Sequence, residues 1–474
     1  MVFNSTVFLV FFIFFYFLYW RINNKYSLNA RNLFILIASY VFYGWWDWRF
    51  LGLIVLSSAV DYFIGLQLTK TDNKLRQKTL LLISLVVNLG VLGFFKYFNF
   101  FIDGLNSLLS QFNIHPVSQS LEIILPVGIS FYTFQTLSYT IDIYRGKIKP
   151  TENILSFFAF VSFFPQLVAG PIERAAHLLP QFKDRKTFNH FTSVKGLRLL
   201  LLGFFKKVVI ADNFGLLANS IFNPENSPSG LTVFLGACFF ALQIYADFSG
   251  YSDIAIGISR LLGFDLMINF KTPYFAKSFG DFWKRWHISL SIWFRDYVYI
   301  PLGGSRNPIS RTYLNLIITF LLSGLWHGAN VTFLIWGGLH GLLLIIEKKF
   351  RLIKLKSVYF PFVLLLVILF WIPFRAENVE LLNSYIKALF SFSNYSTNEI
   401  MQILSDFSIR RFIALISVLT AFLSLEYFTR NKGFDEFLIG KKTWFRYLIY
   451  YLIIVTIILL GNFNVKPSFI YFQF

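Results

Sequence analysis

Repeated apolar runs near the length of a membrane span constrain this chain more than any other feature of its sequence. Runs rich in Phe, Leu and Ile recur along the whole chain and are separated by short polar segments. A stretch of ~20 such residues crosses the hydrocarbon core of a bilayer as one α-helix. In lipid, a spanning segment must satisfy its backbone groups internally. We therefore predict an all-α, polytopic integral membrane protein.

The composition agrees with this prediction. Hydrophobic residues make up 56% of the 474 residues and charged residues 14%, so a soluble fold would lack the polar surface to cover its apolar area. Lys and Arg (43) outnumber Asp and Glu (24), but the basic residues fall between the apolar runs, as the cytoplasmic loops of membrane proteins require. We therefore expect this basic protein to have the lipid bilayer as its partner, and we expect no nucleic-acid partner. The sole cysteine, Cys238, excludes an intrachain disulfide.

The apolar runs predict about 11–13 transmembrane helices. They are expected to form a single integral-membrane domain over residues 1–474, with its core motifs at about 121–346. The expected spans are 3–20, 33–46, 51–68, 79–95, 121–143, 196–212, 230–247, 313–326, 331–346, 358–372, 411–427 and 447–461. We interpret the further run at 154–169 as re-entrant or horizontal, because Pro165 and Gly170-Pro171 break it and a crossing there would place basic loops on both sides.

The basic residues also predict the orientation. The segments expected on the cytoplasmic side are 70–78, 145–149, 183–198, 260–311, 348–356 and 430–446. The first run carries its positive charges after it and shows no small-residue cleavage site, so we expect a retained helix and not a cleaved signal. The prediction is a multi-pass protein of the cell (inner or cytoplasmic) membrane with Met1 and Phe474 both outside.

One stretch, in the second half of the chain, gathers charge, indole rings and two of the six histidines. His327 lies where one apolar run ends and the next begins, directly after Trp326. Gly324 and Gly328 flank it, and Asn330 follows. A histidine at membrane depth usually faces a cavity or a partner, and glycines let a backbone or substrate approach closely. We interpret His327 as functional; the alternative is an interfacial Trp-His pair at a helix end.

His287 lies in a segment that is both aromatic and basic. Around it stand three tryptophans and the charged residues Asp281, Lys284, Arg285, Arg295 and Asp296. We expect one helix lying flat in the membrane interface, and its basic face is a candidate dock for a phosphate-bearing donor or an acidic carrier protein. A zinc site shared by His287 and His327 is not expected, since neither has a second ligand at helical spacing.

Other polar residues within apolar surroundings are candidates for lining a substrate tunnel. They are Asp247, Ser249, Tyr251 and Asp253 at the end of one run, and Gln166 and Glu173 beside the prolines of another. For residues 247–253 the alternative is the N-cap of a helix that starts near residue 252.

Some basic residues lie within the apolar runs themselves. Lys206 and Lys207 interrupt an apolar span, and we expect both to extend to the inner membrane surface. We interpret His340, which follows Trp336-Gly-Gly-Leu, as a structural residue at a helix-packing position.

At these motifs the chain resembles the membrane-bound O-acyltransferases (MBOAT), and most closely their bacterial branch of the alginate O-acetyltransferase type. The matching pieces are Pro126-Val-Gly-Ile-Ser-Phe-Tyr-Thr-Phe-Gln135, Val168-Ala-Gly-Pro-Ile-Glu173, Asp247-Phe-Ser-Gly-Tyr-Ser-Asp253, Asp281-Phe-Trp-Lys-Arg-Trp-His287-Ile-Ser-Leu-Ser291, Arg295-Asp-Tyr-Val-Tyr-Ile-Pro-Leu-Gly-Gly304, Ser323-Gly-Leu-Trp-His327-Gly328 and Phe469-Ile-Tyr-Phe-Gln-Phe474. The resemblance covers essentially the whole chain.

The resemblance implies a ring of helices around a central tunnel, with His327 at the position of the family's near-invariant histidine and His287 at that of its second one. It implies transfer of an acyl group, most simply acetyl, from a cytoplasmic thioester donor (acetyl-CoA or an acyl carrier) to hydroxyls of an extracytoplasmic polysaccharide such as alginate or another exopolysaccharide. A periplasmic or extracellular acyltransferase partner is expected, and no bound cofactor or metal. D-alanyl transfer to teichoic acid, a lipid-directed acyltransferase and a non-enzymatic transporter are the alternatives.

Acyl transfer to a hydroxyl requires a base for its proton and stabilisation of the developing oxyanion. We assign the base to His327, because a neutral imidazole suits that role near neutral pH. His287 is expected to polarise the thioester carbonyl, to hold the donor or to orient His327. The chain has no Gly-x-Ser-x-Gly elbow, so we do not expect a covalent serine intermediate.

Overall fold

The computed structural model describes residues 1–115, 121–168, 170–224, 226, 228–306, 308–352, 359–391, 397–463 and 469–470. Its backbone forms two compact units. Unit 1 comprises Met1–Ser193 and Ser259–Met267, and unit 2 comprises Val194–Ile258 and Ile268–Phe474. Residues 471–474 of the C-terminal motif, including Phe474 with its predicted place outside, lie beyond the described residues, as does Ala169 of a second motif.

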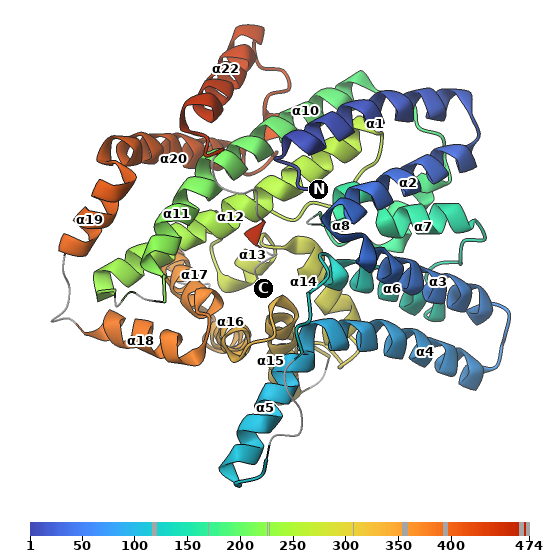
Figure 1. The fold of residues 1–474 in the computed structure, drawn as a ribbon, viewed down its shortest axis with the longest axis horizontal. Coiled ribbons are helices and arrows are strands. Elements are labelled where there is room, and N and C mark those ends of the chain that lie inside the picture. Colours follow the sequence, from blue (N-terminus) through green and yellow to red (C-terminus); the bar gives the residue numbers. More distant parts are fainter. Residues whose placement is uncertain are drawn as a thin grey trace. The chain divides into compact units, whose positions relative to one another are not determined.

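Unit 1 is built from helices that pair in antiparallel fashion along the first part of the chain (Figure 1, blue to cyan-green). Its elements are α1 (Thr6–Lys25), α2 (Leu28–Asp47), η1 (Trp48–Phe50), α3 (Leu51–Leu68), α4 (Lys74–Leu92), the π-helical η2 (Gly93–Tyr97), α5 (Phe98–Gln111), α6 (Ile129–Tyr144), α7 (Ile154–Ser162), α8 (Phe164–Leu167), α9 (Ala175–Leu178) and η3 (Leu179–Phe182).

Polar residues set where several of these helices begin. Ser5, Ser27 and Asn73 stand immediately before α1, α2 and α4, and each side chain accepts a hydrogen bond from a backbone N–H of the first turn. Such N-caps satisfy donors that the helix itself leaves unpaired. Helix α6 is buried along almost its whole length and packs against α3 and α4, so it forms the core of unit 1.

Unit 2 holds the longest helix and most of the later elements (Figure 1, green to red). They are α10 (His190–Phe205), the π-helical η4 (Lys206–Ala211), α11 (Asp212–Ile221), α12 (Gly230–Leu261), η5 (Pro273–Phe275), α13 (Phe279–Trp283), α14 (Ile288–Phe294), the π-helical η6 (Arg295–Tyr299), α15 (Ile309–His327), α16 (Val331–Phe350), α17 (Tyr359–Arg375), α18 (Val379–Phe390), α19 (Asn398–Phe407), α20 (Ile409–Thr429), α21 (Phe434–Phe437) and α22 (Thr443–Leu460). Two of the three divisions between the units fall within helices α10 and α12, and the third follows Met267.

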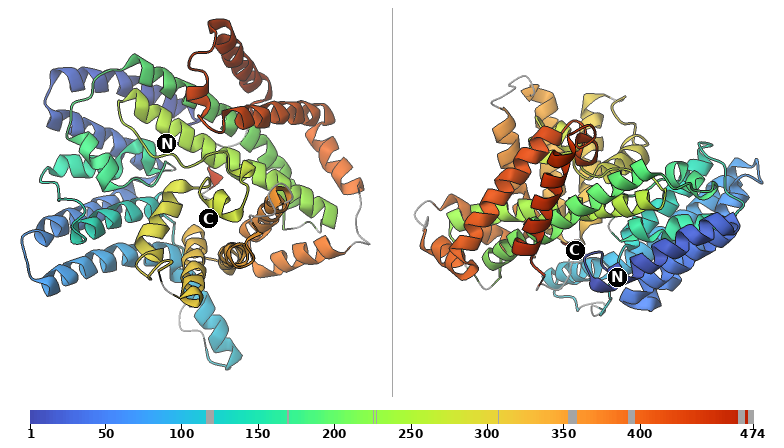
Figure 2. Two further views of the ribbon diagram at one scale, coloured as in Figure 1. Left: turned by 180° about the vertical axis from the view of Figure 1, so that it is seen from behind. Right: turned by 90° about the horizontal axis from the view of Figure 1, so that it is seen from above.

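The core of unit 2 lies along α12 and is strongly aromatic. Two-thirds (67%) of the apolar window of α12 is buried, and Trp286, Trp336 and Trp371 are among the most completely buried side chains. At the edge of unit 2 the opposite holds. Only 6% of the window of α22 is buried, and α22 packs against α20 in a pair that both views of Figure 2 display in dark red and orange-red. An apolar helix this exposed is suited to contact with lipid.

The all-α fold class is confirmed: the described residues form helices and contain no strand. Eight helical stretches among them are long and apolar enough to cross a membrane, which supports a multi-pass membrane protein. The total of about 11–13 spans, the single domain and the central tunnel stay predictions. The run at 154–169 forms α7 and α8, which span nine and four residues. Neither is long enough to cross a bilayer, at ~1.5 Å rise per residue.

Candidate active site

His327 is the last residue of α15, and the way α15 meets α16 fixes its position. The two helices form a tight hairpin in which Gly324 lies against the backbone of Phe333, and Gly337 lies against the backbone of Phe320. A Cβ at either glycine would collide with the carbonyl of the opposing helix, so only glycine permits this approach. The imidazole of His327 is left 3% exposed, inside unit 2.

His287 occupies a strained turn. Its φ angle is +42°, in the left-handed region that a non-glycine residue enters at a cost. Two backbone hydrogen bonds bracket the turn: Ile288 N–H donates to the Asn269 carbonyl at 2.9 Å, and Lys271 N–H donates to the Arg285 carbonyl at 3.0 Å. Backbone pairing with residues 269 and 271 thus stabilises the strained conformation of this turn. The expectation of one continuous interfacial helix is wrong, because α13 ends at residue 283 and α14 begins at residue 288.

The structure brings the two histidines together from separate parts of the chain. Their ring centroids lie 6.1 Å apart. The His287 ring also lies 5.8 Å from the ring of Trp326 and makes an edge contact at 4.6 Å with Phe248 of α12. At this separation, one small bound group is within reach of both imidazoles.

Aromatic rings enclose His327. The rings of Trp326, Trp336 and Phe374 lie 5.0, 5.1 and 5.3 Å from its own ring, all in edge-on arrangements. These side chains come from α15, α16 and α17, three elements of unit 2. Such a surrounding is poor in water, and low local polarity strengthens every electrostatic interaction within it. Trp336 and Phe374 were not among the predicted site residues.

A third histidine, His340, continues this aromatic cluster. Its ring stacks on Phe282 at 6.1 Å and meets Trp283 and Trp336 edge-on at 5.0 Å each. Trp336 therefore touches the rings of both His340 and His327. Among the described residues no group accepts from or donates to Nδ1 of His340. This agrees with the prediction that His340 is a structural residue at a helix-packing position.

His287 is neutral at physiological pH. Complete burial lowers the pKa of its imidazole to about 3, because an apolar surrounding disfavours the charged form. A neutral imidazole offers one N–H donor and one acceptor nitrogen. His287 is therefore equipped to donate a hydrogen bond but not to supply a full positive charge.

Asn269 anchors the His287 turn and was missed at the level of sequence. Its side-chain oxygen accepts from the Ser289 hydroxyl at 2.6 Å, and its amide nitrogen donates to the Ser252 hydroxyl of α12 at 3.1 Å. Together with its backbone bond to Ile288, this buried amide ties α14 to α12. The only sequence signal was a lone amide between Ile268 and Phe270.

The predicted polar segment 247–253 lies in the interior of α12, which continues to Leu261. The alternative of a helix N-cap near residue 252 is therefore wrong. Asp247 forms an ion pair with Lys207 at 2.7 Å and accepts from the backbone N–H of Ile470, also at 2.7 Å. Ser249 is buried, and the ring of Tyr251 contacts Phe469 at 4.5 Å. This segment thus holds residues 469–470 against α12.

The two lysines of η4 are buried, and the expectation that they extend to the membrane surface is wrong. Lys206 pairs with Asp253 at 2.9 Å and lies 3.7 Å from Glu426. Lys207 bonds to Asp212 at 2.8 Å as well as to Asp247. In place of solvent, each ammonium group has two carboxylates, the compensation that a buried charge requires.

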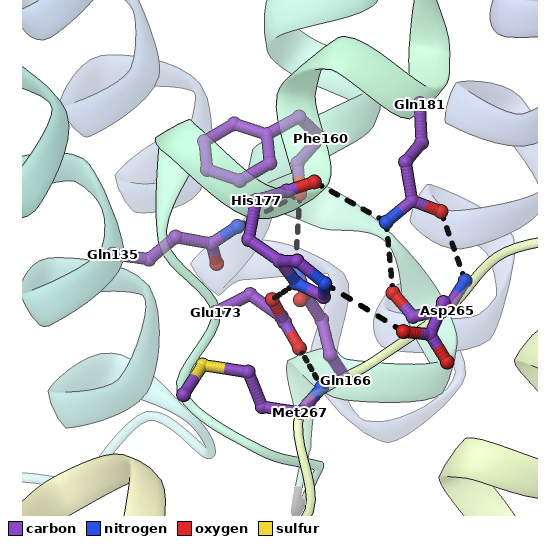
Figure 3. A network of polar contacts seen from close by, with 8 residues as sticks. All are labelled: Gln135, Phe160, Gln166, Glu173, His177, Gln181, Asp265 and Met267. Carbon is purple, nitrogen blue, oxygen red and sulfur yellow. Dashed lines mark hydrogen bonds and ion pairs between the residues drawn. The ribbon is translucent and has the colours of Figure 1, made fainter. Parts of the chain in front are cut away.

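Gln166 and Glu173 belong to unit 1 and tie its segments together (Figure 3). Gln166 and Gln135 both donate to the carbonyl of Phe160, at 2.8 and 2.9 Å. The buried Glu173 carboxylate accepts from His177 at 2.8 Å and from the backbone N–H of Met267. These contacts are structural, and the predicted role of both residues in a tunnel lining remains a prediction.

His177 forms a second bridge to the segment after α12. Its Nε2 lies 3.6 Å from the Asp265 carboxylate. The Gln181 side chain donates to the backbone carbonyl of Asp265 and accepts from the backbone N–H of the same residue. The neighbouring carboxylates of Asp265 and Glu173 raise the pKa of His177 to about 10. His177 is therefore a cation at physiological pH and links the buried Glu173 to the exposed Asp265.

Most of the charges near His287 form local pairs. Arg285 bonds to Asp281 at 2.8 Å, and Arg295 bonds to Asp296 at 2.7 Å. Lys284 is exposed and forms no ion pair within the part of the chain that the structure describes. The predicted basic face is thus partly neutralised by its own acids, whereas the exposed Lys284 lies outside these two pairs.

Asn330 acts at the start of α16. Its side-chain oxygen accepts from Thr332 N–H at 3.0 Å, and its amide donates to the Glu377 carbonyl at 2.6 Å. It caps the helix that follows His327 and fixes the chain after α17 beside it.

Comparison with known proteins identifies the family of this chain. A family model described as MBOAT, membrane-bound O-acyltransferase family, matches residues 148–372. A "probable alginate O-acetylase" of Pseudomonas putida is 40% identical over 500 residues, covering 100% of both chains. The chain belongs to the membrane-bound O-acyltransferase family. A peptidoglycan O-acetyltransferase of Helicobacter pylori is 36% identical to this MBOAT protein over 86% of the chain and 83% of the relative.

A third relative is more distant. A teichoic acid D-alanyltransferase of Bacillus subtilis is 27% identical and covers 50% of this chain and 62% of its own length. As an MBOAT protein the chain is an O-acyltransferase, a multi-pass membrane enzyme whose reaction requires an acyl donor.

Proposed function

We propose that this chain transfers an acetyl group from a cytoplasmic thioester across the cell membrane to hydroxyls of an extracytoplasmic polysaccharide, directly or through a partner acyltransferase outside. The observation that carries the proposal is the meeting of His287 and His327, with ring centroids 6.1 Å apart, inside an aromatic enclosure. Both chain ends are proposed to lie outside, in accord with the distribution of basic residues.

The proposed chemistry assigns a role to each imidazole. His327 accepts the proton of the acceptor hydroxyl while the hydroxyl oxygen bonds to the carbonyl carbon of the thioester. His287, neutral because its pKa is lowered to about 3 by burial, donates a hydrogen bond to the carbonyl oxygen as negative charge develops there. The C–S bond then breaks, and the departing thiolate takes from His327 the proton that came from the acceptor hydroxyl.

The enclosure supports transfer in preference to hydrolysis. Trp326, Trp336 and Phe374 surround His327 and leave it 3% exposed. A thioester held among such rings is shielded from water that would compete with the acceptor hydroxyl.

The relatives favour acetyl as the acyl group. Two similar proteins that cover most or all of the chain are named as an O-acetylase and an O-acetyltransferase, whereas the named D-alanyltransferase matches only half of it. Acetyl-CoA is accordingly the proposed donor, with a carrier-bound D-alanyl thioester as the alternative. The acceptors of those relatives, alginate and peptidoglycan, define the proposed class: a secreted or cell-wall polysaccharide.

The exposed ammonium of Lys284 is the proposed contact for the phosphates of the donor. Charge reversal by Lys284→Glu should raise the KM for acetyl-CoA more than it lowers kcat, because a group that holds only the donor contributes equally to the ground and transition states. Lys74→Glu, at an exposed position on α4, is the matched control and should leave the KM for the donor unchanged.

The test of the proposed function is a transfer assay in vesicles. Purified protein is reconstituted with radiolabelled acetyl-CoA inside and acceptor polysaccharides outside, and label is measured in the polymer, with and without extracts that contain secreted partners. Ester-linked label in the external polymer is the expected result. Labelled D-alanine transfer from a carrier in place of acetyl transfer would favour the alternative donor, and export of an unmodified solute with no ester formed would refute the acyltransferase assignment.

A further inference from the structure

An apolar cleft in unit 2 lies among helices α10, α20 and α22 (Figure 1). It encloses about 270 Å³ and is lined by aliphatic and aromatic side chains, with Thr456 as the one polar residue of its lining. Phe205 comes from α10, Ala421 and Phe422 from α20, and Ile453 from α22. Because α20 and α22 are apolar enough to cross a membrane, the cleft is suited to hydrocarbon, and water would find few polar partners in it.

Two arginines stand about one turn before the lining residues of their helices. Arg198 precedes Leu202 by four positions on α10, and Arg446 precedes Ile449 by three positions on α22. These spacings place each arginine on the cleft face of its helix. Tyr450 brings the two together, because its hydroxyl accepts from Nε of Arg198 at 2.7 Å and it follows Arg446 by one turn of α22.

Neither guanidinium forms an ion pair with a carboxylate among the described residues. Within them the buried Arg198, 5% exposed, bonds only to neutral acceptors: the Tyr450 hydroxyl and, at 2.8 Å, the backbone carbonyl of Asp435. Arg446 donates to the Thr443 hydroxyl at 3.2 Å, and its buried Nε has no hydrogen-bond partner in the part of the chain that the structure describes. A buried cation without a compensating anion is costly, and a guanidinium matches the geometry of a phosphate.

The surrounding charge also favours an anion. The segment 430–446, which joins α20 to α22, carries five Lys and Arg residues and two acids, Asp435 and Glu436. Glu436 bonds to Lys195 at 3.0 Å and so offers little compensation to the arginines. The distribution of basic residues predicts this segment on the cytoplasmic side, where the membrane carries its anionic lipids. Charge complementarity thus selects an anionic headgroup at this end of the cleft.

We propose that the cleft binds one acyl chain of an anionic phospholipid whose phosphate is held by Arg198 and Arg446. The cleft suits a single flexible chain, whereas a protein partner would require an open face of ~800 Å². Only 6% of the apolar window of α22 is buried, so a lipid bound here would join this exposed helix to α10 and α20. The proposed ligand is structural and acts on stability, apart from the reaction at the paired histidines.

Binding can be measured by native mass spectrometry of the full-length protein in detergent. Dioleoyl phosphatidylglycerol and dioleoyl phosphatidylcholine, which share their acyl chains, are titrated separately. The anionic lipid should bind about tenfold more tightly. Arg446→Gln should weaken it about fivefold, because one basic residue near an anionic lipid contributes about that much. Arg410→Gln, at an exposed position near the start of α20 and outside the cleft, is the matched control and should bind like the wild type.

A second pair of variants tests the cleft itself. Ala421→Phe fills the cleft from an exposed position of its lining and should abolish the tight binding of phosphatidylglycerol. Thr420→Phe adds the same ring at the neighbouring exposed position outside the lining and should leave binding unchanged. Phosphatidylglycerol added to delipidated protein should raise the melting temperature of the wild type and of Thr420→Phe, but not that of Ala421→Phe, because a ligand stabilises only the protein that binds it.

Several outcomes would overturn the proposal. Equal affinity for the two lipids would refute the anion site, as would full binding of phosphatidylglycerol by Arg446→Gln. Glycerophosphoglycerol, the headgroup without chains, or inorganic phosphate binding as tightly as the lipid would show an anion site that uses no acyl chain. A dimer of the wild type that Ala421→Phe dissociates would assign the cleft to a second copy of the chain. No acyl donor is present, so failure of the proposed reaction would not alter any of these results.

Discussion

The burial of Lys207 allows a direct energetic test of the structure. Its side chain is 3% exposed and forms ion pairs with Asp212 and Asp247 at 2.8 and 2.7 Å. Lys207→Met preserves much of the side-chain volume but removes the ammonium group. It leaves two carboxylates, 13% and 3% exposed, without their shared cation.

The expected loss of stability follows from this geometry. Removing one partner of a buried ion pair typically costs ~3–5 kcal/mol, because the remaining charge is desolvated and uncompensated. The ratio of folded to unfolded protein should fall by a factor of about 10²–10⁴. Lys207→Met/Asp247→Asn should recover part of this loss, since one of the two stranded charges is gone; the effects of neighbours in one network are not additive.

The assay is the loss of monodisperse protein on heating in detergent, read by fluorescence-detected gel filtration. Lys284→Met, which removes an exposed lysine from the same unit, is the control and should melt like the wild type. A Lys207→Met protein with an unchanged melting curve would refute the reasoning. It would mean that the lysine reaches the membrane surface, as the sequence alone suggested.

Two further predictions test the orientation and the unit 1 network. Single cysteines at Lys74 and Asn383, in a Cys238→Ala background, should react with an impermeant reagent from opposite sides of the membrane, and labelling of both from one side would overturn the orientation. The ion pairs of His177 should stabilise the protein below its ordinary pKa near 6.5 and lose their contribution as pH rises through about 10, because its folded-state pKa is raised. The difference in melting temperature between wild type and His177→Gln should therefore shrink from pH 6 to pH 10.5, and a constant difference would contradict this linkage.

The sequence predicted the features that depend on local pattern. The run at 51–68 coincides with α3 (Leu51–Leu68), because apolar length and flanking polar residues define such a span. The place of His327 at the end of a helix was likewise readable from the glycines around it. The pairing of His287 with His327 came from the resemblance to a known family, since no spacing rule relates residues so far apart.

The features that the sequence did not predict depend on partners distant in the chain. The left-handed turn at His287 is stabilised by backbone hydrogen bonds to residues 269 and 271. The sequence next to His287 does not predict this turn. The sequence favours a surface position for Lys206, because its partner Glu426 lies more than two hundred positions away. The predicted span at 230–247 is shorter than α12, which continues to Leu261. A Ser-Gly-Tyr-Ser segment resembles a helix boundary in sequence, but burial against other helices keeps it helical.

The central claim is that His327 performs the proton transfer, and acetyl transfer by His327→Ala tests it most directly. Activity is measured in reconstituted membranes and normalised to folded protein. General base catalysis typically contributes ~10²–10⁴-fold, so His327→Ala should lose about that much of kcat while it inserts and melts as the wild type does. His287→Ala should lose less, and the double variant should be little worse than His327→Ala, because residues that serve one step are not additive. Full activity of folded His327→Ala would contradict the account.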